Sequence, residues 1–368
     1  MKLIILRSHL KSGLDAVGRA TVSNLNLPVL GNVLIKTVSN QIKLSATNLE
    51  IAVTKAVYGK IIEDGSVTVP YAVLSNIVNN TTSDRINLET KQNNLVIKTD
   101  NYEAKISGIG EGEFPIVPKV KESKEYLEIT ASILKDSLER VVIAAGVSDL
   151  RPEISGVFFN LESSELKLAA TDTFRLAEVK IPGSQIKNNF NKGVGIIIPL
   201  KTSQELMRVI SSEESVSVYV DNNQVLFKTQ DLEIVSRLIE GKFPDYSAII
   251  PKDSDVKVLV TKEDLINSLK LTSSLGSRVN EVKLKVDGKK VLEVYASDNA
   301  LGENNYLVPA KITGDSMQIA FNWRYLLDGV KVLSGDQVLL GLNGEKKPAI
   351  ISTPGDASYF YILMPLNQ

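Results

Sequence analysis

Residue types that usually carry out catalysis are scarce in this sequence. The chain has no cysteine, which excludes disulfides, thiolate nucleophiles and cysteine-based zinc sites. His9 is the only histidine, so one chain cannot form a site with several histidine ligands, and a Ser-His-Asp triad would have to use this residue. His9 lies in Arg7-Ser8-His9-Leu10, where a first helix is predicted to begin. This position favours a surface histidine over a catalytic base.

Two other patterns could suggest an enzyme. Glu111 and Glu113 are a potential carboxylate pair, but they alternate in a polar loop, where such side chains are usually solvated. The segment Gly108-Ile109-Gly110-Glu111-Gly112 has the wrong spacing for a dinucleotide-binding motif, and the sequence contains no P-loop. We therefore expect a protein that is not an enzyme and that binds no cofactor or metal ion.

The overall charge restricts the function further. The 368 residues include 42 Lys and Arg and 43 Asp and Glu, for a formal net charge of −1. A conventional DNA-binding domain is strongly basic, because phosphate contacts supply most of its affinity. No apolar run reaches the roughly 18 residues of a membrane helix. The apolar stretch in Met1–Arg7 is too short for a signal peptide and predicts a strand. We expect a cytoplasmic protein with no membrane partner.

An internal repeat is the most informative feature of the sequence. A short apolar strand followed by Ala, a hydroxyl residue and Asn or Asp occurs three times, at 44–52, 168–177 and 294–301. The spacings between the copies are 124 and 126 residues. Because Asn and Asp side chains accept hydrogen bonds from nearby backbone N–H groups, each copy predicts a tight turn after a strand.

Helical patterns lie before and after each copy of this strand and turn. The predicted helices are 10–17, 71–79, 134–143, 201–210, 265–275 and 323–333. Thr130 and Thr261 are predicted N-caps, and Thr261-Lys262-Glu263-Asp264 resembles a capping box. Pro70 and Pro199 suit the start of a helix, where the N–H that proline lacks is not needed.

Alternating strands follow the second helix of each repeat. Polar turns at 92–94 and 221–224 predict two hairpins. Each repeat thus combines two helices with many antiparallel strands, which is an α+β fold. The predicted domains are residues 1–120, 125–251 and 256–368, joined by linkers at Pro118–Lys124 and Pro251–Asp255.

Five further segments are each weak signals of a protein family, but together they are specific, because they occur in order on a threefold repeat of this length. They are 27–32 (LPVLGN), 170–177 (ATDTFRLA), 241–246 (GKFPDY), 321–327 (FNWRYLL) and 361–366 (YILMPL). With them the chain resembles the bacterial replicative sliding clamps, the beta subunits of DNA polymerase III, over essentially its whole length. The resemblance implies three clamp domains per chain and two chains joined head-to-tail in a closed ring around duplex DNA. It also implies a processivity factor whose partners are the polymerase catalytic subunit, an ATP-driven clamp loader and other proteins with clamp-binding motifs.

The width of a helix agrees with a ring of two chains. Helices about 10–12 Å wide would leave a hole of roughly 10 Å if six lined it and roughly 30 Å if twelve did. Duplex DNA is roughly 20 Å across. A closed ring cannot leave DNA sideways, so weak, sequence-independent phosphate contacts suffice and permit sliding. The near-zero net charge is compatible with this mechanism.

The resemblance assigns candidate residues to two of the surfaces, the inner wall and the ring interface. Cations on the predicted helices and in the loop before Pro152 are candidates for DNA contacts: Lys11, Arg19, Lys135, Arg140, Arg151, Lys201, Arg208, Lys270, Arg324 and Lys331. For each of them a solvated helix face is an equally good explanation. Ala104, Ile106 and Leu275 are candidates for the interface between the two chains.

A third surface is an apolar cleft that binds a short peptide of partner proteins. The resemblance places it at Ile154, Thr171, Thr173, Phe174, Arg175, Leu176, Pro244, Ala248, Ile249, Asn322, Tyr325, Ile362, Leu363, Met364, Pro365 and Leu366. Apolar side chains with an adaptable methionine suit varied peptides, and Arg175 could meet their acidic or carbonyl groups. Leu176 and Ile362 could equally be core strand positions.

The chain departs from the family at several of these positions. Asn24 and Val73 stand where well-known members have DNA-contacting arginines, and Ala104 stands at an aromatic interface position. Phe174 occupies a place where histidine is common, and the chain ends Asn367-Gln368 where a basic residue is usual. We expect altered DNA contacts, a different interface and a different partner preference.

Three other functions stay open on the sequence alone. An enzyme would turn over nucleotides or sugars. A groove-binding or single-strand-binding protein would need a basic stripe or stacking aromatics, whereas aromatic residues are only 6% of this chain. A duplicated peptide-binding scaffold would share the cleft and lack topological linkage to DNA, so only a test of the ring separates it from a clamp.

Overall fold

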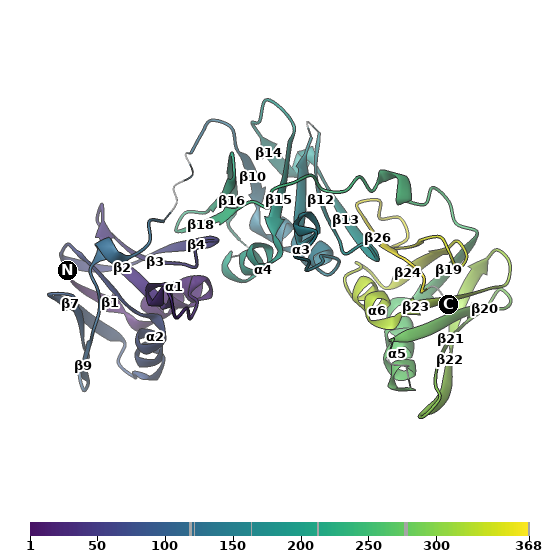
Figure 1. The fold of residues 1–368 in the computed structure, drawn as a ribbon, viewed down its shortest axis with the longest axis horizontal. Helices are drawn as coiled ribbons and strands as arrows, with labels where there is room; N and C mark the ends of the chain where they lie inside the picture. Colours follow the sequence, from purple (N-terminus) through teal and green to yellow (C-terminus); the bar gives the residue numbers. More distant parts are fainter. Residues whose placement is uncertain (118–119, 121, 163, 212, 276–278, 367–368) are drawn as a thin grey trace. The chain divides into compact units, whose positions relative to one another are not determined.

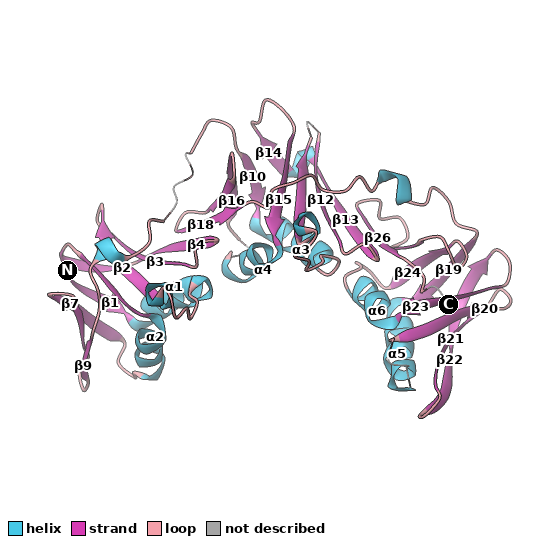
Figure 2. Cartoon of the chain, viewed as in Figure 1, coloured by secondary structure: helices cyan, strands magenta, loops and turns pink. Residues whose placement is uncertain are grey.

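The computed structural model describes residues 1–117, 120, 122–162, 164–211, 213–275 and 279–366. Part of the predicted linker Pro118–Lys124 and the terminal Asn367-Gln368 lie outside these residues. Within them, antiparallel strands predominate and a few helices accompany the sheets (Figure 2). The α-helices are α1 (Arg7–Val17), α2 (Tyr71–Asn80), α3 (Ala131–Val142), α4 (Leu200–Val209), α5 (Lys262–Thr272) and α6 (Trp323–Lys331). All six predicted helices are confirmed, although α1, α3 and α5 begin three residues earlier than predicted.

Short 3-10 helices lie at turns between these elements. They are η1 (Gly18–Ala20), η2 (Pro28–Gly31), η3 (Glu111–Glu113), η4 (Pro152–Ile154), η5 (Gly183–Gln185), η6 (Ser247–Ile249) and η7 (Ser273–Leu275). Among the described residues, no helix is long and apolar enough to span a membrane.

The chain contacts divide into two compact units whose borders differ from those of the three repeats. Unit 1 contains Met1–Ser132, Ile186–Asn191 and Glu205–Leu238, and unit 2 contains Ile133–Gln185, Lys192–Gln204 and Ile239–Gln368. The borders differ because a sheet continues from one repeat into the next within each unit.

Unit 1 contains two antiparallel sheets, coloured purple to teal in Figure 1. The five-stranded sheet has the order β5 (Gly59–Glu63), β1 (Lys2–Leu6), β7 (Arg85–Lys91), β8 (Asn94–Lys98) and β9 (Glu103–Ile106). The nine-stranded sheet has the order β14 (Ile186–Asn188), β10 (Leu127–Thr130), β16 (Ser215–Asp221), β17 (Gln224–Lys228), β18 (Leu232–Arg237), β4 (Ile51–Val57), β3 (Gln41–Thr47), β2 (Asn32–Val38) and β6 (Ser66–Pro70). The predicted hairpins are confirmed as β7–β8 and β16–β17.

Strands β4 and β18 join the first repeat to the second inside this sheet. Their register pairs Val53 with Ile234 and Lys55 with Leu232. Helix α1 covers β3 and β4 with the buried side chains of Leu10, Leu14 and Val17. Gly13 permits this close packing, because a Cβ atom there would lie 2.4 Å from a methyl carbon of Leu44.

Unit 2 contains one twelve-stranded antiparallel sheet. Its order is β15 (Val194–Pro199), β11 (Gly156–Leu161), β12 (Glu165–Thr171), β13 (Arg175–Pro182), β26 (Tyr359–Leu363), β25 (Ala349–Ser352), β24 (Gln337–Leu342), β19 (Val256–Thr261), β22 (Gly302–Thr313), β21 (Val291–Asp298), β20 (Glu281–Val286) and β23 (Met317–Asn322). Strands β13 and β26 join the second repeat to the third, with Leu176 opposite Ile362 and Arg175 opposite Leu363.

The turn predicted from the repeat is present in the first two copies. In the first, the Asn48 Oδ1 atom accepts hydrogen bonds from the N–H groups of Glu50 at 3.0 Å and Ile51 at 2.9 Å. Leu49 adopts a positive φ of 77° there. In the second, Asp172 Oδ1 accepts hydrogen bonds from the N–H groups of Phe174 and Arg175 at 2.9 Å each, and Thr173 has a φ of 78°.

The third copy differs in one detail. Asp298 Oδ1 still accepts from the N–H groups of Ala300 at 2.8 Å and Leu301 at 3.2 Å, but the positive φ falls on Gly302. The capping box predicted at Thr261 is also different, because the Thr261 hydroxyl donates to the Asp264 carboxylate and caps no backbone N–H. The shorter side chain of Asp264 reaches the hydroxyl, whereas a capping-box glutamate reaches back to the backbone.

The first turn supplies a test of how much this motif stabilises the fold. Asn48→Ala should lower the free energy of unfolding by about 1 kcal/mol, because two N–H groups lose their acceptor. Asn48→Asp should retain wild-type stability, because Asp172 performs the same role in the second copy. Urea unfolding measures both, with Asn267→Ala on the exposed face of α5 as the control. Equal midpoints for Asn48→Ala and the control would show that water replaces the side chain at no cost.

Candidate partner site and DNA-facing hollow

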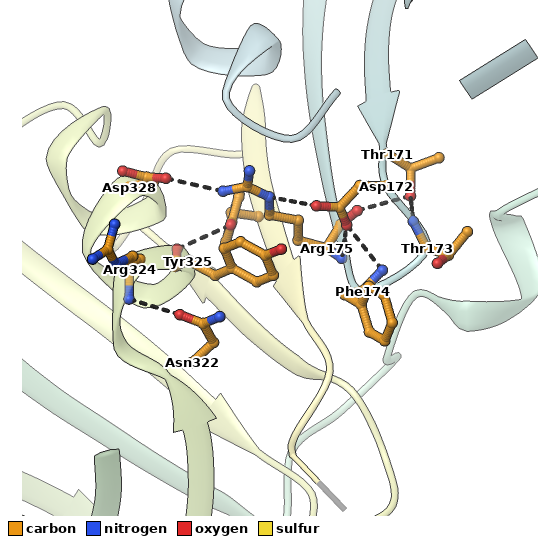
Figure 3. Close-up of polar contacts among 10 residues, drawn as sticks. Thr171, Asp172, Thr173, Phe174, Arg175, Asn322, Arg324, Tyr325 and Asp328 are labelled. Atoms are coloured by element: carbon orange, nitrogen blue, oxygen red, sulfur yellow. Dashed lines mark hydrogen bonds and ion pairs between the residues drawn. The ribbon is translucent and has the colours of Figure 1, made fainter. Parts of the chain in front are cut away.

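Arg175, the first residue of β13, is the centre of a polar cluster in unit 2 (Figure 3). Its Nε atom lies 2.9 Å from Asp172 Oδ2, in the turn just before β13, and an Nη atom lies 3.0 Å from Asp328 Oδ2 on α6. The guanidinium carbon lies 4.0 Å from the ring centroid of Tyr325, also on α6. One cation thus connects the β12–β13 turn to a helix of the third repeat.

Tyr361 on β26 lies beneath this cluster and is fully buried. Its hydroxyl donates to the backbone carbonyl of Tyr325 at 3.0 Å. A Cβ atom at Gly329 would lie 2.5 Å from the Tyr361 ring, so the glycine lets α6 approach β26. Burial raises the pKa of the Tyr361 hydroxyl well above its usual value, and the residue therefore remains a neutral donor. Burial alone would lower the pKa of Arg175, but Tyr361 and Asp172 outweigh it and the net effect is upward.

The guanidinium of Arg175 is occupied by these contacts, and only 13% of the side chain is exposed. The resemblance predicted that Arg175 meets acidic or carbonyl groups of a peptide. In the structure its charge is instead shared between Asp172 and Asp328, and its flat face covers Tyr325. Arg175 therefore holds the frame of the candidate site together.

The other candidate partner residues fall into three classes of exposure. Ile154, Thr171, Leu176, Ile362, Leu363 and Pro365 are buried. Pro244, Asn322, Tyr325, Met364 and Leu366 are half-buried, and Thr173, Phe174, Ala248 and Ile249 are exposed. Leu176 and Ile362 are core positions paired across β13 and β26, which is the plainer of the two explanations that the sequence left open.

Phe174 is the most prominent apolar side chain of this surface, with 61% of its area exposed. Its backbone carbonyl accepts a hydrogen bond from the Met364 N–H at 2.8 Å, so the turn and the C-terminal segment are fixed to each other. The Leu366 N–H donates to Ala320 in the same way at 2.8 Å. Asn322 caps α6 by accepting from the Arg324 N–H at 3.0 Å (Figure 3).

The segment that carries Pro244, Ala248 and Ile249 is fixed by aromatic contacts. Phe243 stacks on Phe158 with ring centroids 4.8 Å apart. The Tyr246 hydroxyl donates to the buried Glu178 carboxylate at 2.5 Å. Burial is the larger cause, and this hydrogen bond the second, of a raised pKa of the Tyr246 hydroxyl. This fixed segment, the Phe174 turn and the C-terminal strand all belong to unit 2. Asp328 and Tyr361 carry no sequence signal for their role, because only folding brings them to Arg175.

Unit 1 contains a hollow of about 970 Å³ that brings candidate DNA-facing cations together. It is lined by Ser8, Lys11, Ser12, Asp15, Ala16, Gly18, Arg19, Lys55, Tyr71, Arg208 and Val209. Lys11, Arg19 and Arg208 were predicted from the sequence, whereas Lys55 and Tyr71 were not. Lys55 lies on a strand, and a search confined to helices therefore misses it.

The remaining predicted cations differ in availability. Lys201, Lys270, Arg324 and Lys331 are exposed on helices, Lys135 is half-buried on α3, and Arg151 is exposed beside Glu153 at 3.1 Å. The structure does not favour the prediction that Arg140 contacts DNA, because only 17% of its side chain is exposed. Its guanidinium pairs with Asp136 at 3.0 Å and Asp356 at 3.9 Å, so it stabilises unit 2 and is a poor candidate for a phosphate contact.

Two of the three predicted interface positions, Ala104 and Ile106, lie on an edge strand of unit 1. Strand β9 is the last strand of its sheet; Ile106 is buried and Ala104 is half-buried on it. Beside β9, a hollow of about 310 Å³ is lined by residues that include Ile77 and the exposed Tyr102. Leu275 lies in η7 of unit 2 and is half-buried. Tyr102 is thus an exposed aromatic side chain two residues before Ala104.

His9 and Glu111, two of the residues that could suggest an enzyme, have structural partners. His9 Nδ1 lies 3.0 Å from the backbone carbonyl oxygen of Tyr58, and its ring meets the Tyr58 ring edge-on. Glu111 forms an ion pair with Lys36, and this hydrogen bond lowers the carboxyl pKa. In the described part of the chain, no group of three or more His, Cys, Asp or Glu residues is arranged to hold a metal ion.

Comparison with solved structures defines the class of fold. The chain is similar to the DNA polymerase sliding clamp from Bacillus subtilis, with a TM-score of 0.94 and 26% identity over 100% of this chain and 99% of that one. It is also similar to the DNA polymerase III beta subunit from Thermotoga maritima, with a TM-score of 0.91, 26% identity and the same coverage. The three domains of this chain therefore have the sliding-clamp fold.

Sequence comparison identifies the family. The Beta sliding clamp of Synechocystis is 31% identical over 392 residues, covering 100% of this chain and 99% of the relative, and that of Synechococcus elongatus is 29% identical over 377 residues with the same coverage. Models of the N-terminal, central and C-terminal domains of the DNA polymerase III beta subunit match residues 1–118, 128–245 and 247–367. The chain belongs to the DNA polymerase III beta subunit family, whose members are non-catalytic processivity factors.

Removal of Arg175 tests whether it holds the candidate site together. Arg175→Ala should lower the free energy of unfolding by about 2–3 kcal/mol, because Asp172 and the partly exposed Asp328 lose their shared cation. Arg175→Lys should recover only part of this, since one ammonium cannot form the same fork of bonds. Arg151→Ala, which breaks an exposed pair with Glu153, is the matched control and should cost less than about 1 kcal/mol. Equal losses in chemical unfolding for Arg175→Ala and Arg151→Ala would contradict the role proposed for Arg175.

Proposed function

We propose that this chain is a DNA sliding clamp that encircles duplex DNA as a head-to-tail ring of two copies and tethers a DNA polymerase to it. The observation that carries this proposal is the match of all three clamp domains, in order, over the length of the chain. The chain itself needs no catalytic centre, because retention on DNA follows from closure of the ring around it.

Two open strand edges support ring closure. Strand β9 has a neighbour only on its β8 side. Within the described residues, 302–307 of β22 pair with β21 alone, because β19 pairs with residues 310–313. An open edge presents unpaired N–H and C=O groups that can extend a sheet into a second chain. Since one edge lies in each unit, pairing β9 of one copy with β22 of the next would give a head-to-tail contact, and the proposed ring is the case in which this contact closes after two copies.

Apolar side chains beside each edge complement this pairing. Leu271 on α5 is exposed, and its backbone carbonyl accepts from Asn304 Nδ2 of β22 at 3.4 Å, so the leucine lies next to the second edge. The hollow beside β9 is lined by Ile77 and Tyr102 among Asn and Thr side chains, and it has room for such a side chain. Tyr102 offers at this edge the aromatic side chain that Ala104 does not.

The hollow of unit 1 supports sequence-independent contact with DNA. Lys and Arg side chains recognise phosphates by charge, and serine and tyrosine hydroxyls can donate to phosphate oxygens. The hollow contains Lys and Arg side chains as well as serine and tyrosine hydroxyls, together with the acidic Asp15. Such a mixed surface favours weak contacts, which a closed ring can tolerate and sliding requires.

The exposed surface around Phe174 and Met364 supports peptide binding by the partner proteins. Phe174 offers an aromatic face, Met364 is adaptable, and Ile249 adds apolar area from a third segment. Each of these residues is fixed through its backbone or its neighbours, so little ordering is needed on binding. The chemistry fits an apolar segment of a polymerase or of a clamp loader.

Topological retention is the direct test of the ring. After loading by a clamp loader and a moderate-salt wash, the protein should remain on nicked circular DNA and be lost from the same DNA after linearisation. Closure of the ring predicts this difference, because a ring can slide off a free end. Equal retention on both substrates would mean ordinary surface binding. Absence from both, with peptide binding intact, would favour the peptide-binding scaffold.

Truncation of the partner surface should separate tethering from DNA retention. Phe174→Ala combined with Met364→Ala should weaken binding of a clamp-binding peptide by about 2 kcal/mol or more, because two central apolar contacts are removed. The fraction of loaded protein that stays on circular DNA through the wash should be unchanged, whereas the amount loaded should fall if the clamp loader uses the same surface. Val291→Ala, an exposed apolar residue on β21, is the matched control. Unchanged peptide affinity, measured by calorimetry, would place the partner site elsewhere.

A further inference from the structure

Lys55 on β4 differs from the other cations of the unit 1 hollow in where its side chain is held. Its Nζ atom lies 2.6 Å from Asp231 Oδ1, and the two side chains are only 16% and 26% exposed. Asp231 precedes β18, and its backbone carbonyl accepts from the Ala56 N–H at 2.7 Å. The ion pair therefore lies where β4 of the first repeat meets β18 of the second.

Lys55 also lines the hollow together with Lys11, Arg19 and Arg208. Arg208 is paired with the nearly buried Glu205 at 3.2 Å, and Lys11 donates to the Asn79 side chain. Arg19 has no carboxylate partner among the described residues. Two of the four cations are thus neutralised locally by Asp231 and Glu205, and the lining residue Asp15 adds a further negative charge.

This arrangement has a consequence for a surface that must hold DNA weakly. A phosphate that enters the hollow meets Arg19 unpaired, but it can gain Lys55 only in competition with Asp231. The exchange replaces one Lys–carboxylate contact with a Lys–phosphate contact, so the net gain in free energy is smaller than for a free lysine. Loss of Asp231 would remove this competition.

We propose that Lys55 is an additional phosphate-contacting residue and that Asp231 restrains it, so that the Lys55–Asp231 pair limits how strongly the hollow attracts the DNA backbone. The proposal rests on the proposed function as a DNA clamp. It assigns a role to a strand residue outside the helices and to a carboxylate that never needs to touch DNA.

The two members of the pair make opposite predictions. Lys55→Gln should weaken binding of a short fluorescent duplex by about threefold, the effect of one phosphate contact over an ordinary salt range, and reduce the slope of log affinity against log salt by about 1. Asp231→Asn should tighten binding by a similar factor. The double variant should resemble Lys55→Gln alone, because Asp231 acts only through Lys55. If the Lys55–Asp231 pair only stabilised the fold, both single variants would change the affinity for the duplex in the same direction.

The experiment is fluorescence anisotropy of the full-length protein with the duplex over a salt series. Lys289→Gln, on an exposed turn of unit 2, controls for loss of one positive charge, and thermal unfolding of each variant reports any loss of the fold. Arg19→Gln serves as the reference for DNA contact in the hollow. If Arg19→Gln weakens binding but Asp231→Asn leaves it unchanged or weakens it, the restraint by Asp231 is overturned. If neither Arg19→Gln nor Lys55→Gln changes binding, the hollow does not contact DNA and the DNA contact proposed above fails as well.

Discussion

Main-chain hydrogen bonding between repeats is the interaction on which the rest of this structure depends. Strand β4 pairs with β18 in unit 1, and β13 pairs with β26 in unit 2, so each sheet passes from one repeat into the next. A sheet joined in this way fixes its strands in register, because a slip of one residue would turn every side chain to the opposite face. The repeats are therefore not independent domains joined only by linkers, and the borders of the compact units differ from those of the repeats.

The candidate partner site is a consequence of the β13–β26 pairing. That pairing places Arg175 opposite Leu363 and brings the β12–β13 turn to the C-terminal segment. The same register puts Tyr361 beneath α6, where its hydroxyl and the Arg175 guanidinium meet Tyr325. Buried groups of this kind are costly unless every one is paired, and here the cation has two carboxylates and an aromatic face. The exposed Phe174 is thus carried on a turn whose neighbours cannot move independently.

The β4–β18 pairing has a corresponding effect on the hollow of unit 1, which is proposed to contact DNA. It places Lys55 against Asp231, so the junction that joins two repeats also restrains a cation that lines the hollow. This agrees with the net charge of −1, which is unusual for a protein that acts on DNA. A ring retained by its closure has no need of strong phosphate contacts, and strong contacts would slow its sliding. Balanced charge is in this sense part of the proposed mechanism.

The sequence by itself determined the periodic features: the threefold repeat, the six helices, the two hairpins and the Asx turns at Asn48 and Asp172. These follow from local rules, since hydrophobic period and turn chemistry act over a few residues. It also indicated which family to compare, through segments that carry the resemblance together. Only the tertiary structure decided the partners of charged side chains. Nothing in the sequence indicates whether Arg140 and Arg175 are solvated or paired. In the structure, Arg140 forms ion pairs with Asp136 and Asp356. Arg175 forms ion pairs with Asp172 and Asp328. Lys55 and Asp231 are 176 residues apart in the chain. Such pairs depend on strand register between distant segments, and no local pattern encodes that.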